Sequence, residues 1–202
     1  MNISTIFFDL GKVLLDYDFN LAAYRVAQRS HLNPEKILEG IYPPEMIAAY
    51  EAGKIDCASF FTQTKELTGF EGTWEELHEL WTDIFTPINE HIQLARQLAQ
   101  YYPLALISNI SEAHVRQVEA TFDFFPIFRK LFYSCRVGHI KPYPEIYEHA
   151  LGEMKADRFE ALFIDDREDN ILTAAKMGWQ TIHLRPDVNL RLALQSYELK
   201  GV

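Results

Sequence analysis

The sequence predicts an open α/β fold, in which helices cover both faces of a parallel β-sheet and a helical module follows the first strand. Short apolar runs, which are typical of strands buried on both faces, alternate with stretches of helical periodicity. Roughly ninety residues lie between Val13 and Leu104, whereas a single crossover connection needs about a dozen. The chain therefore carries a second group of helices between the first two strands of its sheet.

The expected strands are five short apolar runs: Thr5–Phe8, Leu104–Ile107, Leu131–Tyr133, Ala161–Ile164 and Thr181–Leu184. Helices are expected between them, because Ile92–Ala99 repeats apolar residues at helical spacing and Ser111 can cap the helix after the second strand. Pro144 suits a first helical turn, and Gly178 can end the helix before the last strand. A short helix around Leu190–Tyr197 is expected in the tail. The pattern is that of a Rossmann-like open parallel sheet with helices on both faces.

The inserted stretch is expected to be helical throughout. Its helices are Leu21–Ser30, Pro34–Leu38, Glu45–Ala52, Cys57–Leu67 and a last one that leads from Thr73 to Phe85. Thr73 and Glu76 have the spacing of a capping box, in which each side chain bonds to the main chain of the other. We therefore expect an α/β core domain formed by residues 1–15 and 88–202 and a helical cap domain formed by residues 16–87.

Composition and charge narrow the range of partners. The 202 residues suffice for one full-sized domain or for a domain that carries an insertion. There are 29 acidic and 19 basic residues, and no run of Lys or Arg could follow a phosphate backbone. No stretch approaches the roughly 18 consecutive apolar residues that a membrane span needs. Nucleic acid and membranes are therefore not expected as partners, whereas a small anionic substrate is compatible with a few local cations.

A cytoplasmic location is expected. The N-terminal residues Met1–Thr5 lack the basic region of a signal peptide, and Asp9 interrupts the apolar run that follows. Cys57 and Cys135 lie far apart and show neither a metal-ligand spacing nor a disulfide framework, so two reduced thiols are expected. The sequence leaves the oligomeric state open.

Acidic residues directly follow the first and the fourth expected strands. Because the carboxyl ends of parallel strands lie at one edge of a sheet, we expect Asp9, Asp165 and Asp166 to meet there. Taken singly, each is more often a turn or cap residue. Taken together, carboxylates at one place repel unless a cation lies between them, and oxygen ligands suit Mg²⁺. The sequence therefore predicts a magnesium site at this edge of the sheet.

Residues that suit phosphate binding flank the acidic cluster. Ser108 and Asn109 follow the second strand, and Lys141 stands just ahead of an expected helix start, where a lysine can neutralise a phosphate. Gly11, two residues after Asp9, lets the backbone approach a ligand closely. A metal ion, a lysine, a hydroxyl donor and an unpaired carboxylate together describe phosphoryl transfer through an aspartyl-phosphate.

Four motifs in this order resemble those of the haloacid dehalogenase superfamily of hydrolases. They are Phe8–Val13, Leu106–Asn109, Gly138–Pro142 and Phe163–Asn170, and the resemblance spans the chain from about Ile6 to His183. Each motif alone is weak, but four in the expected order, each at a strand end or a helix start, are a strong signal. The helical insertion resembles the family's cap of the first class.

The resemblance implies how catalysis and metal binding are divided. Asp9 would be the nucleophile and would also ligate Mg²⁺ through its other oxygen. The carbonyl of Gly11 would be a second ligand, and Asp166 a third.

The resemblance also implies a phosphate site. Ser108 and the amide of Asn109 would bind phosphate oxygens, and Lys141 would offset the charge of the nucleophile and the phosphate together. Asp165 and Asn170 would contact these residues rather than the substrate and would hold them in place.

The chain departs from the family's pattern at Gly11. Many phosphatases of the superfamily carry there a second aspartate, which protonates the leaving oxygen, and general acid catalysis is worth about 10²–10⁴-fold. Asp16 and Asp18 stand nearby and could serve instead, or they could be polar residues of a flap or hinge. Through Asp18-Phe19-Asn20 the start of the chain resembles the bacterial glucose-1-phosphate phosphatases, whose anomeric oxygen leaves somewhat more easily than an ordinary alcohol.

The function expected first is a Mg²⁺-dependent phosphatase that acts on a small phosphorylated metabolite, for example a sugar phosphate. The cap would close over the substrate, and the stretch Tyr50–Lys54 between cap helices would reach the site. One alternative is a 2-haloacid dehalogenase, which needs the nucleophile and the lysine but no metal. Another is a non-catalytic protein of the same fold that binds a phosphate ligand. The lack of a general acid at position 11, where the chain has glycine, supports this alternative.

Overall fold

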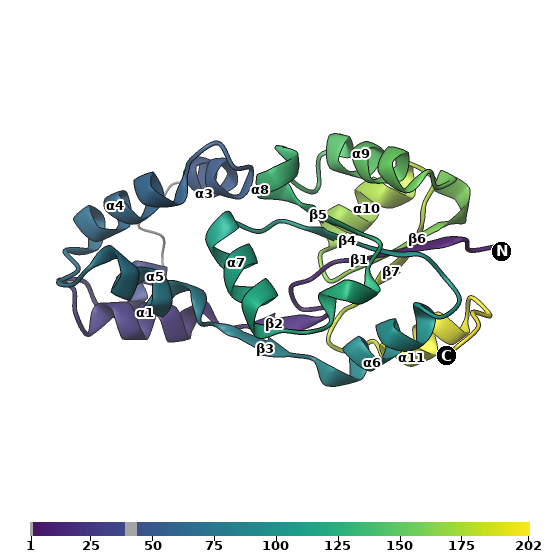
Figure 1. Cartoon of the computed structure of the whole chain (residues 1–202), viewed down its shortest axis with the longest axis horizontal. Coiled ribbons are helices and arrows are strands. Elements are labelled where there is room, and N and C mark those ends of the chain that lie inside the picture. The colour runs from purple at the N-terminus through teal and green to yellow at the C-terminus, as the bar shows by residue number, and fades with distance from the viewer. Residues whose placement is uncertain (1, 39–43) are drawn as a thin grey trace.

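The core of the protein is a five-stranded, fully parallel β-sheet with the strand order β5-β4-β1-β6-β7. The computed structural model describes residues 2–38 and 44–202. The strands are β1 (Thr5–Phe8), β4 (Leu104–Ser108), β5 (Lys130–Tyr133), β6 (Ala161–Asp165) and β7 (Gln180–His183). Each coincides with an expected strand to within one residue at either end, and the predicted α/β fold is confirmed. The central position belongs to β1 (Figure 1).

Two apolar layers bury the two faces of the sheet. On β1, Ile6 and Phe8 face one layer and Phe7 faces the other, as the alternation of side chains along a strand requires. The first layer receives residues of α6 (Asn89–Leu98), α7 (Glu112–Thr121) and α11 (Leu190–Gln195). The second receives residues of α9 (Pro144–Met154) and α10 (Glu168–Lys176). Burial on both faces explains why the strands are apolar runs without alternation.

Three short helical turns complete the core. They are η1 (Phe125–Ile127), α8 (Ser134–Val137) and η2 (Arg158–Glu160). The turn α8 ends at Gly138, whose φ of 85° lies in the left-handed region, and the chain then enters the segment that carries Lys141.

The inserted helices form a group of their own at one end of the molecule, away from the two termini (Figure 1). They are α1 (Phe19–Ala27), α2 (Pro34–Leu38), α3 (Pro44–Glu51), α4 (Cys57–Thr68) and α5 (Trp74–Thr82). A separate apolar cluster holds them together, with Phe60 and Phe61 of α4 and Leu77 of α5 at its centre; Ala113 is the only fully buried member contributed by the core helices among the described residues. The expected capping box is present, since Thr73 and Glu76 bond reciprocally.

A two-stranded antiparallel ribbon connects the inserted helices to the sheet. Its strands are β2 (Leu15–Tyr17) and β3 (Phe85–Pro87), with Tyr17 opposite Phe85. This ribbon was not expected from the sequence, and the prediction that the last inserted helix leads as far as Phe85 is wrong. The helix ends at Thr82 instead, because Asp83 leaves the helical conformation at a φ of −82° and a ψ of 66°. Strands of three residues are too short to show a period of two in a sequence.

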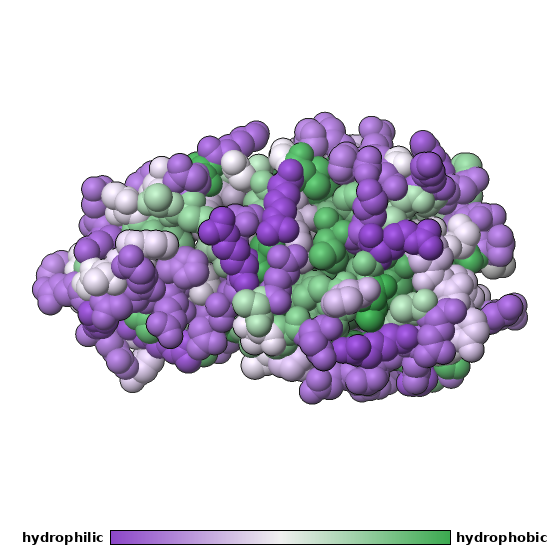
Figure 2. Space-filling model, in the orientation of Figure 1, coloured by the Kyte–Doolittle hydropathy of each residue, from purple (hydrophilic) through white to green (hydrophobic). Residues whose placement is uncertain are grey.

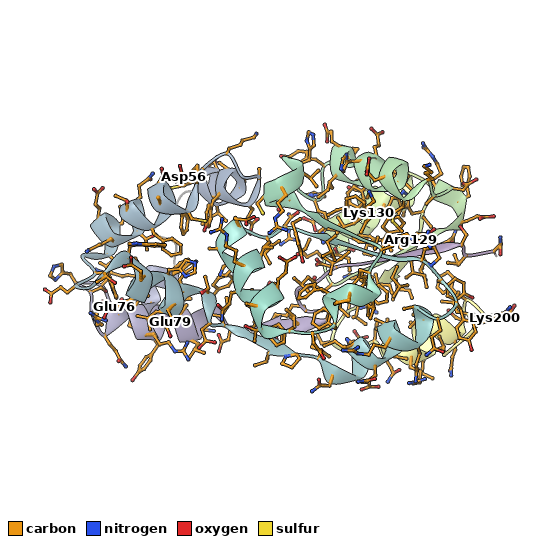
Figure 3. The ribbon with its side chains drawn as sticks, viewed as in Figure 1. Asp56, Glu76, Glu79, Arg129, Lys130 and Lys200 are labelled. Carbon is orange, nitrogen blue, oxygen red and sulfur yellow. The ribbon has the colours of Figure 1, made fainter. Side chains whose placement is uncertain are left out.

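Hydrophilic residues cover most of the face shown in Figure 2, with apolar residues between them over the middle of the molecule. In Figure 3 the labelled acidic residues, Asp56, Glu76 and Glu79, lie among the inserted helices, whereas the labelled basic ones lie outside them, Arg129 and Lys130 at the start of β5 and Lys200 in the C-terminal tail. Within the described residues, no helix combines the length and the apolar character that crossing a membrane requires.

Candidate active site

Asp9 stands at the carboxyl end of the central strand, where a carboxylate would normally be solvated, yet it is only 7% exposed. Its main-chain N–H donates to the carbonyl of Ile164 (2.9 Å), which continues the pairing of β1 with β6 beyond the strand. The N–H of Leu10 donates to Oδ1 of Asp9 (2.7 Å) and fixes the carboxylate's orientation. Burial raises the pKa of Asp9 to about 7, and the nearby Lys141 acts in the opposite direction.

Lys141 lies between two buried carboxylates. Its Nζ is 2.8 Å from Oδ1 of Asp9 and 2.6 Å from Oδ2 of Asp165, and the residue is 3% exposed. Burial alone would lower the pKa of Lys141, but the carboxylates of Asp165 and Asp9 outweigh it, and the pKa lies above its usual value. Lys141 is therefore a permanent buried cation next to Asp9.

Asn109 fixes the segment that carries this lysine. Its side-chain amide donates to the carbonyl of Lys141 (2.8 Å), and its Oδ1 accepts from the N–H of Lys141 (2.7 Å). This reciprocal pair joins the end of β4 to the segment before α9, so the side chain of Asn109 positions Lys141. Ser108, the last residue of β4 and 3% exposed, opens into the same space.

Asp165 is completely buried and has hydrogen-bond donors on both of its oxygens. Oδ1 accepts from the N–H of Arg167 (2.8 Å), and Asn170 Nδ2 lies 3.0 Å from each carboxylate oxygen. With Lys141 on Oδ2, these donors stabilise the charged carboxylate in the interior. Asn170 thus holds Asp165, and Asp165 holds Lys141.

Three carboxylates come together at the edge of the sheet, as the sequence predicted. Asp9, Asp165 and Asp166 each offer an oxygen within 4.8 Å of the others. Burial, followed by the charge of Asp165, raises the pKa of Asp166, and the cations Lys141 and Arg167 act in the opposite direction. Because the oxygens of Asp165 already have donors, Asp9 and Asp166 are the carboxylates left to face an ion. Oxygen donors of this kind fit Mg²⁺.

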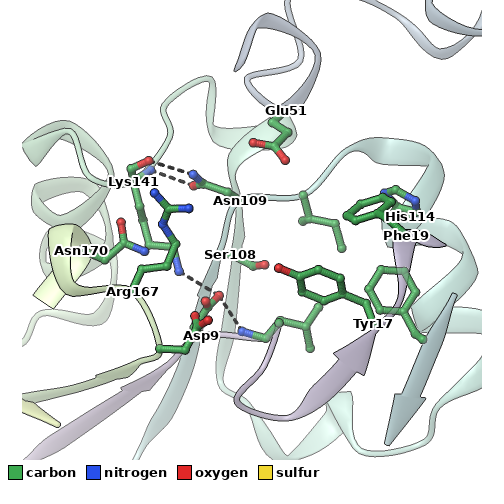
Figure 4. Close-up of a pocket in the computed structure, with 15 residues that line it drawn as sticks. Asp9, Tyr17, Phe19, Glu51, Ser108, Asn109, His114, Lys141, Arg167 and Asn170 are labelled. Atoms are coloured by element: carbon green, nitrogen blue, oxygen red, sulfur yellow. Dashed lines mark hydrogen bonds and ion pairs between the residues drawn. The ribbon is translucent and has the colours of Figure 1, made fainter. Parts of the chain in front are cut away.

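These groups open into a cavity of about 270 Å³ (Figure 4). Every expected site residue except the completely buried Asp165 lines it, namely Asp9, Gly11, Ser108, Asn109, Lys141, Asp166 and Asn170. Glu51, from the stretch Tyr50–Lys54 that was expected to reach the site, also lines the cavity. The remaining walls come from residues that were not expected there: Leu10, Tyr17, Phe19, Phe85, Ile110, His114 and Arg167.

The inserted helices contribute Phe19 from the start of α1 and Glu51 from the end of α3 to the wall, and Glu51 lies across the cavity from Asp9 (Figure 4). Burial raises the pKa of Glu51, and the cations Arg167 and Lys141 act against that rise. Arg167 itself is held at the rim by two hydrogen bonds to Asp169 (3.1 and 2.7 Å). The cavity thus presents a carboxylate and a guanidinium above the acidic cluster.

His114 lies in the wall between α7 and the inserted helices. Its Nδ1 is 3.2 Å from Oγ of Ser111, and its Nε2 is 3.4 Å from the carbonyl of Trp81. Burial lowers the pKa of His114 to about 4, so the ring is neutral near pH 7. A histidine three residues after a helix cap carries no signal in a sequence, which is why His114 was missed.

Tyr17 forms the wall beside Gly11. Lys12, in the left-handed conformation at a φ of 57°, donates from Nζ to the carbonyl of Tyr17 (2.9 Å) and lies 4.5 Å from the centre of the ring. The N–H of Tyr17 donates to Oδ1 of Asp16 (2.8 Å). Burial, and then the charges of Asp166 and Asp9, raise the pKa of Tyr17.

Neither of the two acids considered as replacements for the missing aspartate at Gly11 lines the cavity. Asp16 forms an ion pair with Lys12, its side chain is 55% exposed, and hydrogen bonding to Lys12 lowers its pKa. Asp18 accepts from the N–H of Asn20 (2.9 Å) and caps α1. Both positions therefore fit the alternative expectation, in which Asp16 and Asp18 are polar residues of a flap or hinge.

Comparison with known proteins places these features in a family. The profile of the family described as haloacid dehalogenase-like hydrolases matches residues 3–178. The D-ribitol-5-phosphate phosphatase of Bacteroides thetaiotaomicron is 26% identical over 186 residues, 89% of this chain and 90% of that protein. The sesquiterpene phosphatase astK of Aspergillus oryzae is 27% identical over 153 residues, 74% of this chain and 77% of that protein.

Solved structures share the fold. A haloacid dehalogenase family enzyme of Bacteroides thetaiotaomicron, crystallised with magnesium and inorganic phosphate, superimposes with a TM-score of 0.85 over 95% of this chain and 99% of that chain, at 23% identity. The L-2-haloacid dehalogenase of Xanthobacter autotrophicus superimposes with a TM-score of 0.66 over 97% of this chain and 83% of that chain, at 17% identity.

Proposed function

We propose a Mg²⁺-dependent phosphatase activity for this chain, which belongs to the haloacid dehalogenase-like family of hydrolases. The observation that carries the proposal is the pairing of a buried lysine with Asp9 beside a second carboxylate, Asp166, that faces the same cavity. A cation site and a buried ammonium at one nucleophile suit a doubly charged phosphate ester better than a neutral electrophile. The phosphatases among the relatives support the same reading.

Asp9 is the proposed nucleophile. A carboxylate oxygen of Asp9 attacks phosphorus, the bond from phosphorus to the ester oxygen breaks, and water then hydrolyses the aspartyl-phosphate. The N–H of Leu10 and the ammonium of Lys141 hold the carboxylate for this attack. Asp165 and Asn170 in turn hold Lys141 in place.

The remaining groups bind the phosphate and the metal. Ser108 and the main-chain amide of Asn109 bind phosphate oxygens, since the side-chain amide of Asn109 is held by Lys141, and Lys141 offsets the charge that Asp9 and the phosphate bring together. Asp9, the carbonyl of Gly11 and Asp166 would hold Mg²⁺. When bound, the ion neutralises charge on the phosphate oxygens.

The proposed substrate is a small phosphorylated metabolite with several hydroxyl groups, such as a sugar or polyol phosphate. One relative that matches 89% of this chain is a D-ribitol-5-phosphate phosphatase. The carboxylate of Glu51 can accept hydrogen bonds from hydroxyls, and it disfavours a second anionic group on the substrate. Closure of the inserted helices over the cavity would exclude water from the site.

Replacing the nucleophile tests the mechanism. In Asp9→Asn, phosphate release from 4-nitrophenyl phosphate and from a panel of sugar and polyol phosphates should fall by about a thousandfold or more. The matched control is Asp123→Asn, a solvent-exposed aspartate after α7 that pairs with Arg96. Phosphate release by Asp9→Asn at the rate of the unmodified chain would rule out this nucleophile.

Removing the metal separates the phosphatase from the two alternatives. Excess EDTA should abolish phosphate release, and added Mg²⁺ should restore it; activity on 2-halo acids that survives EDTA would favour a dehalogenase instead. Mg²⁺ should also raise the melting temperature, because it binds only the folded chain, and Asp166→Asn should weaken that rise. Binding of inorganic phosphate without turnover of any ester in the panel would favour a non-catalytic protein.

A further inference from the structure

The ring of Tyr17 occupies the space that a side chain at position 11 would need. A Cβ built on Gly11 would lie 2.9 Å from Cε1 of Tyr17 and 3.4 Å from Cδ1. Gly11 is two residues from Asp9, and both glycine and tyrosine line the cavity with it. The glycine and the tyrosine are therefore a matched pair beside the reacting carboxylate, in which the absence of one side chain makes room for the other.

Contacts with four neighbouring residues fix the position of this ring. Lys12 binds the carbonyl of Tyr17 and lies over its ring, while Asp16 accepts from its N–H. The edge of the ring packs against Phe19, with the ring centres 5.4 Å apart. Pairing of Tyr17 with Phe85 in the ribbon sets the face on which the side chain projects. The exposed ion pair of Lys12 with Asp16 thus helps to hold Tyr17 in its place in the cavity wall.

The hydroxyl of Tyr17 is directed into the cavity, toward Ser108 (Figure 4). The other hydrogen-bonding side chains of the wall are held differently. Both ring nitrogens of His114 have partners, Arg167 is paired with Asp169, and Glu51 lies across the cavity from Asp9. Among the described residues that line the cavity, Ser108 and Tyr17 carry hydroxyls; Ser108 is assigned to the phosphate, so Tyr17 offers the second hydroxyl, on the side of the ribbon.

We propose that the hydroxyl of Tyr17 contacts the leaving group and donates a hydrogen bond to the ester oxygen as the bond to phosphorus breaks. The inference rests on the proposed phosphatase activity and specifies how that site expels its alcohol. Asp9 gains the phosphoryl group, and the electron pair of the broken bond stays on the ester oxygen. That oxygen finally takes a proton from water, so Tyr17 ends the step unchanged. A hydrogen bond to this oxygen stabilises the negative charge that develops on it.

The dependence of the rate on the leaving group tests this role. An ordinary alcohol develops more negative charge on its oxygen than 4-nitrophenol does, so it depends more on a hydrogen-bond donor. In Tyr17→Phe, kcat/KM for an alkyl phosphate, such as glycerol phosphate or a polyol phosphate, should fall about 10- to 100-fold. The fall for 4-nitrophenyl phosphate should be several-fold smaller. Phenylalanine keeps the ring and its packing, so melting curves should show a folded variant.

Tyr24→Phe is the matched control, because Tyr24 is an exposed tyrosine of α1 that does not line the cavity. Equal losses on both substrates in Tyr17→Phe would mean that the residue only shapes the wall, and no loss on either would also overturn the proposal. If the unmodified chain releases phosphate from none of these esters, the proposed function itself fails. A selective loss on the alkyl ester in an active enzyme supports the proposal.

Discussion

At the scale of the residue, Lys141 is a buried cation, and burying a cation is costly unless its charge is compensated. An ammonium buried between Asp9 and Asp165 is stable only because both carboxylates and their hydrogen bonds compensate it. The same cation holds the carboxylate of Asp9 in place and prepares the site for a dianionic ligand. Stability and the proposed chemistry therefore depend on one side chain.

Replacing Lys141 with methionine should cost about 3–5 kcal/mol of unfolding free energy near pH 7, because two buried carboxylates lose their counter-cation. The pKa of Asp9, which burial already raises to about 7, should then rise further, because Lys141 no longer opposes the effect of burial. The cost therefore shrinks as the pH falls below 7 and Asp9 becomes protonated in both proteins. Urea unfolding at several pH values measures both effects.

Lys130→Met is the matched control for this change. Lys130 pairs with Glu153 at 2.7 Å on the surface, where both side chains are nearly half exposed, and its loss should cost at most about 1 kcal/mol. Equal costs in the two variants would contradict the account of Lys141 as a compensated buried cation.

At the scale of the element, α7 joins the sheet to the inserted helices. Val115 and Val118 of this helix pack in a layer against the sheet, whereas Ala113 belongs to the cluster of the inserted helices. His114 extends from the same turn to the carbonyl of Trp81 in α5, and its ring packs against Phe85 of the ribbon. A neutral buried histidine is thus part of the contact between the two groups of helices.

This contact should weaken in acid. Burial lowers the pKa of His114 to about 4 in the folded chain, below its ordinary value of 6.5 in the unfolded chain. Between these values the unfolded state binds a proton that the folded state does not, so stability falls as the pH drops from about 6.5 to about 4. The loss amounts to at most about 3 kcal/mol.

His114→Gln should flatten this dependence of the unfolding free energy between pH 6.5 and 4, because glutamine does not titrate. His149→Gln, which changes an exposed histidine of α9, serves as the control. An unchanged slope in His114→Gln would show that other groups cause the loss of stability in acid.

At the scale of the whole molecule, the inserted helices have their own apolar cluster and meet the rest of the chain through the ribbon, through α7 and through α8, whose Ser134 donates to the carbonyl of Glu51. We propose that they form a separate cap domain. The expected division at residues 16–87 would cut the ribbon, whereas a division after Tyr17 and before Phe85 keeps both strands with the core, since these two residues are paired.

Deleting residues 18–84 should therefore leave a folded core. Because Tyr17 and Phe85 are cross-strand partners, a two-residue Asn-Gly turn can join them as a hairpin. The shortened chain should melt cooperatively and still hydrolyse 4-nitrophenyl phosphate, but it should lose its discrimination among sugar and polyol phosphates along with Glu51. Circular dichroism and kcat/KM across the substrate panel measure this. A chain that unfolds on deletion would show that the two groups of helices are one folding unit.

The sequence alone was sufficient to predict the parallel sheet and its order of elements, because apolar runs and helical periods are local properties. The proximity of Asp9, Lys141 and Asp166 could also be predicted, because in a parallel sheet the segments after the strands share one edge. The capping box at Thr73 was equally predictable, since both of its partners lie within one turn. The chemistry that can be read from strand ends was therefore accessible without a structure.

Only the tertiary structure decided which side chains surround that chemistry. The ribbon of β2 and β3 is too short to show its period, and its register alone turns Tyr17 toward Gly11 and leaves Asp16 in solvent. The stretch Tyr50–Lys54 was expected to reach the site, but the sequence does not show that Glu51 is its residue in the wall. Nor does it place His114 there, because both positions depend on packing between distant helices that no spacing in the chain encodes. The reacting centre follows from topology, whereas the environment of the leaving group depends on contacts between segments that are far apart in the sequence.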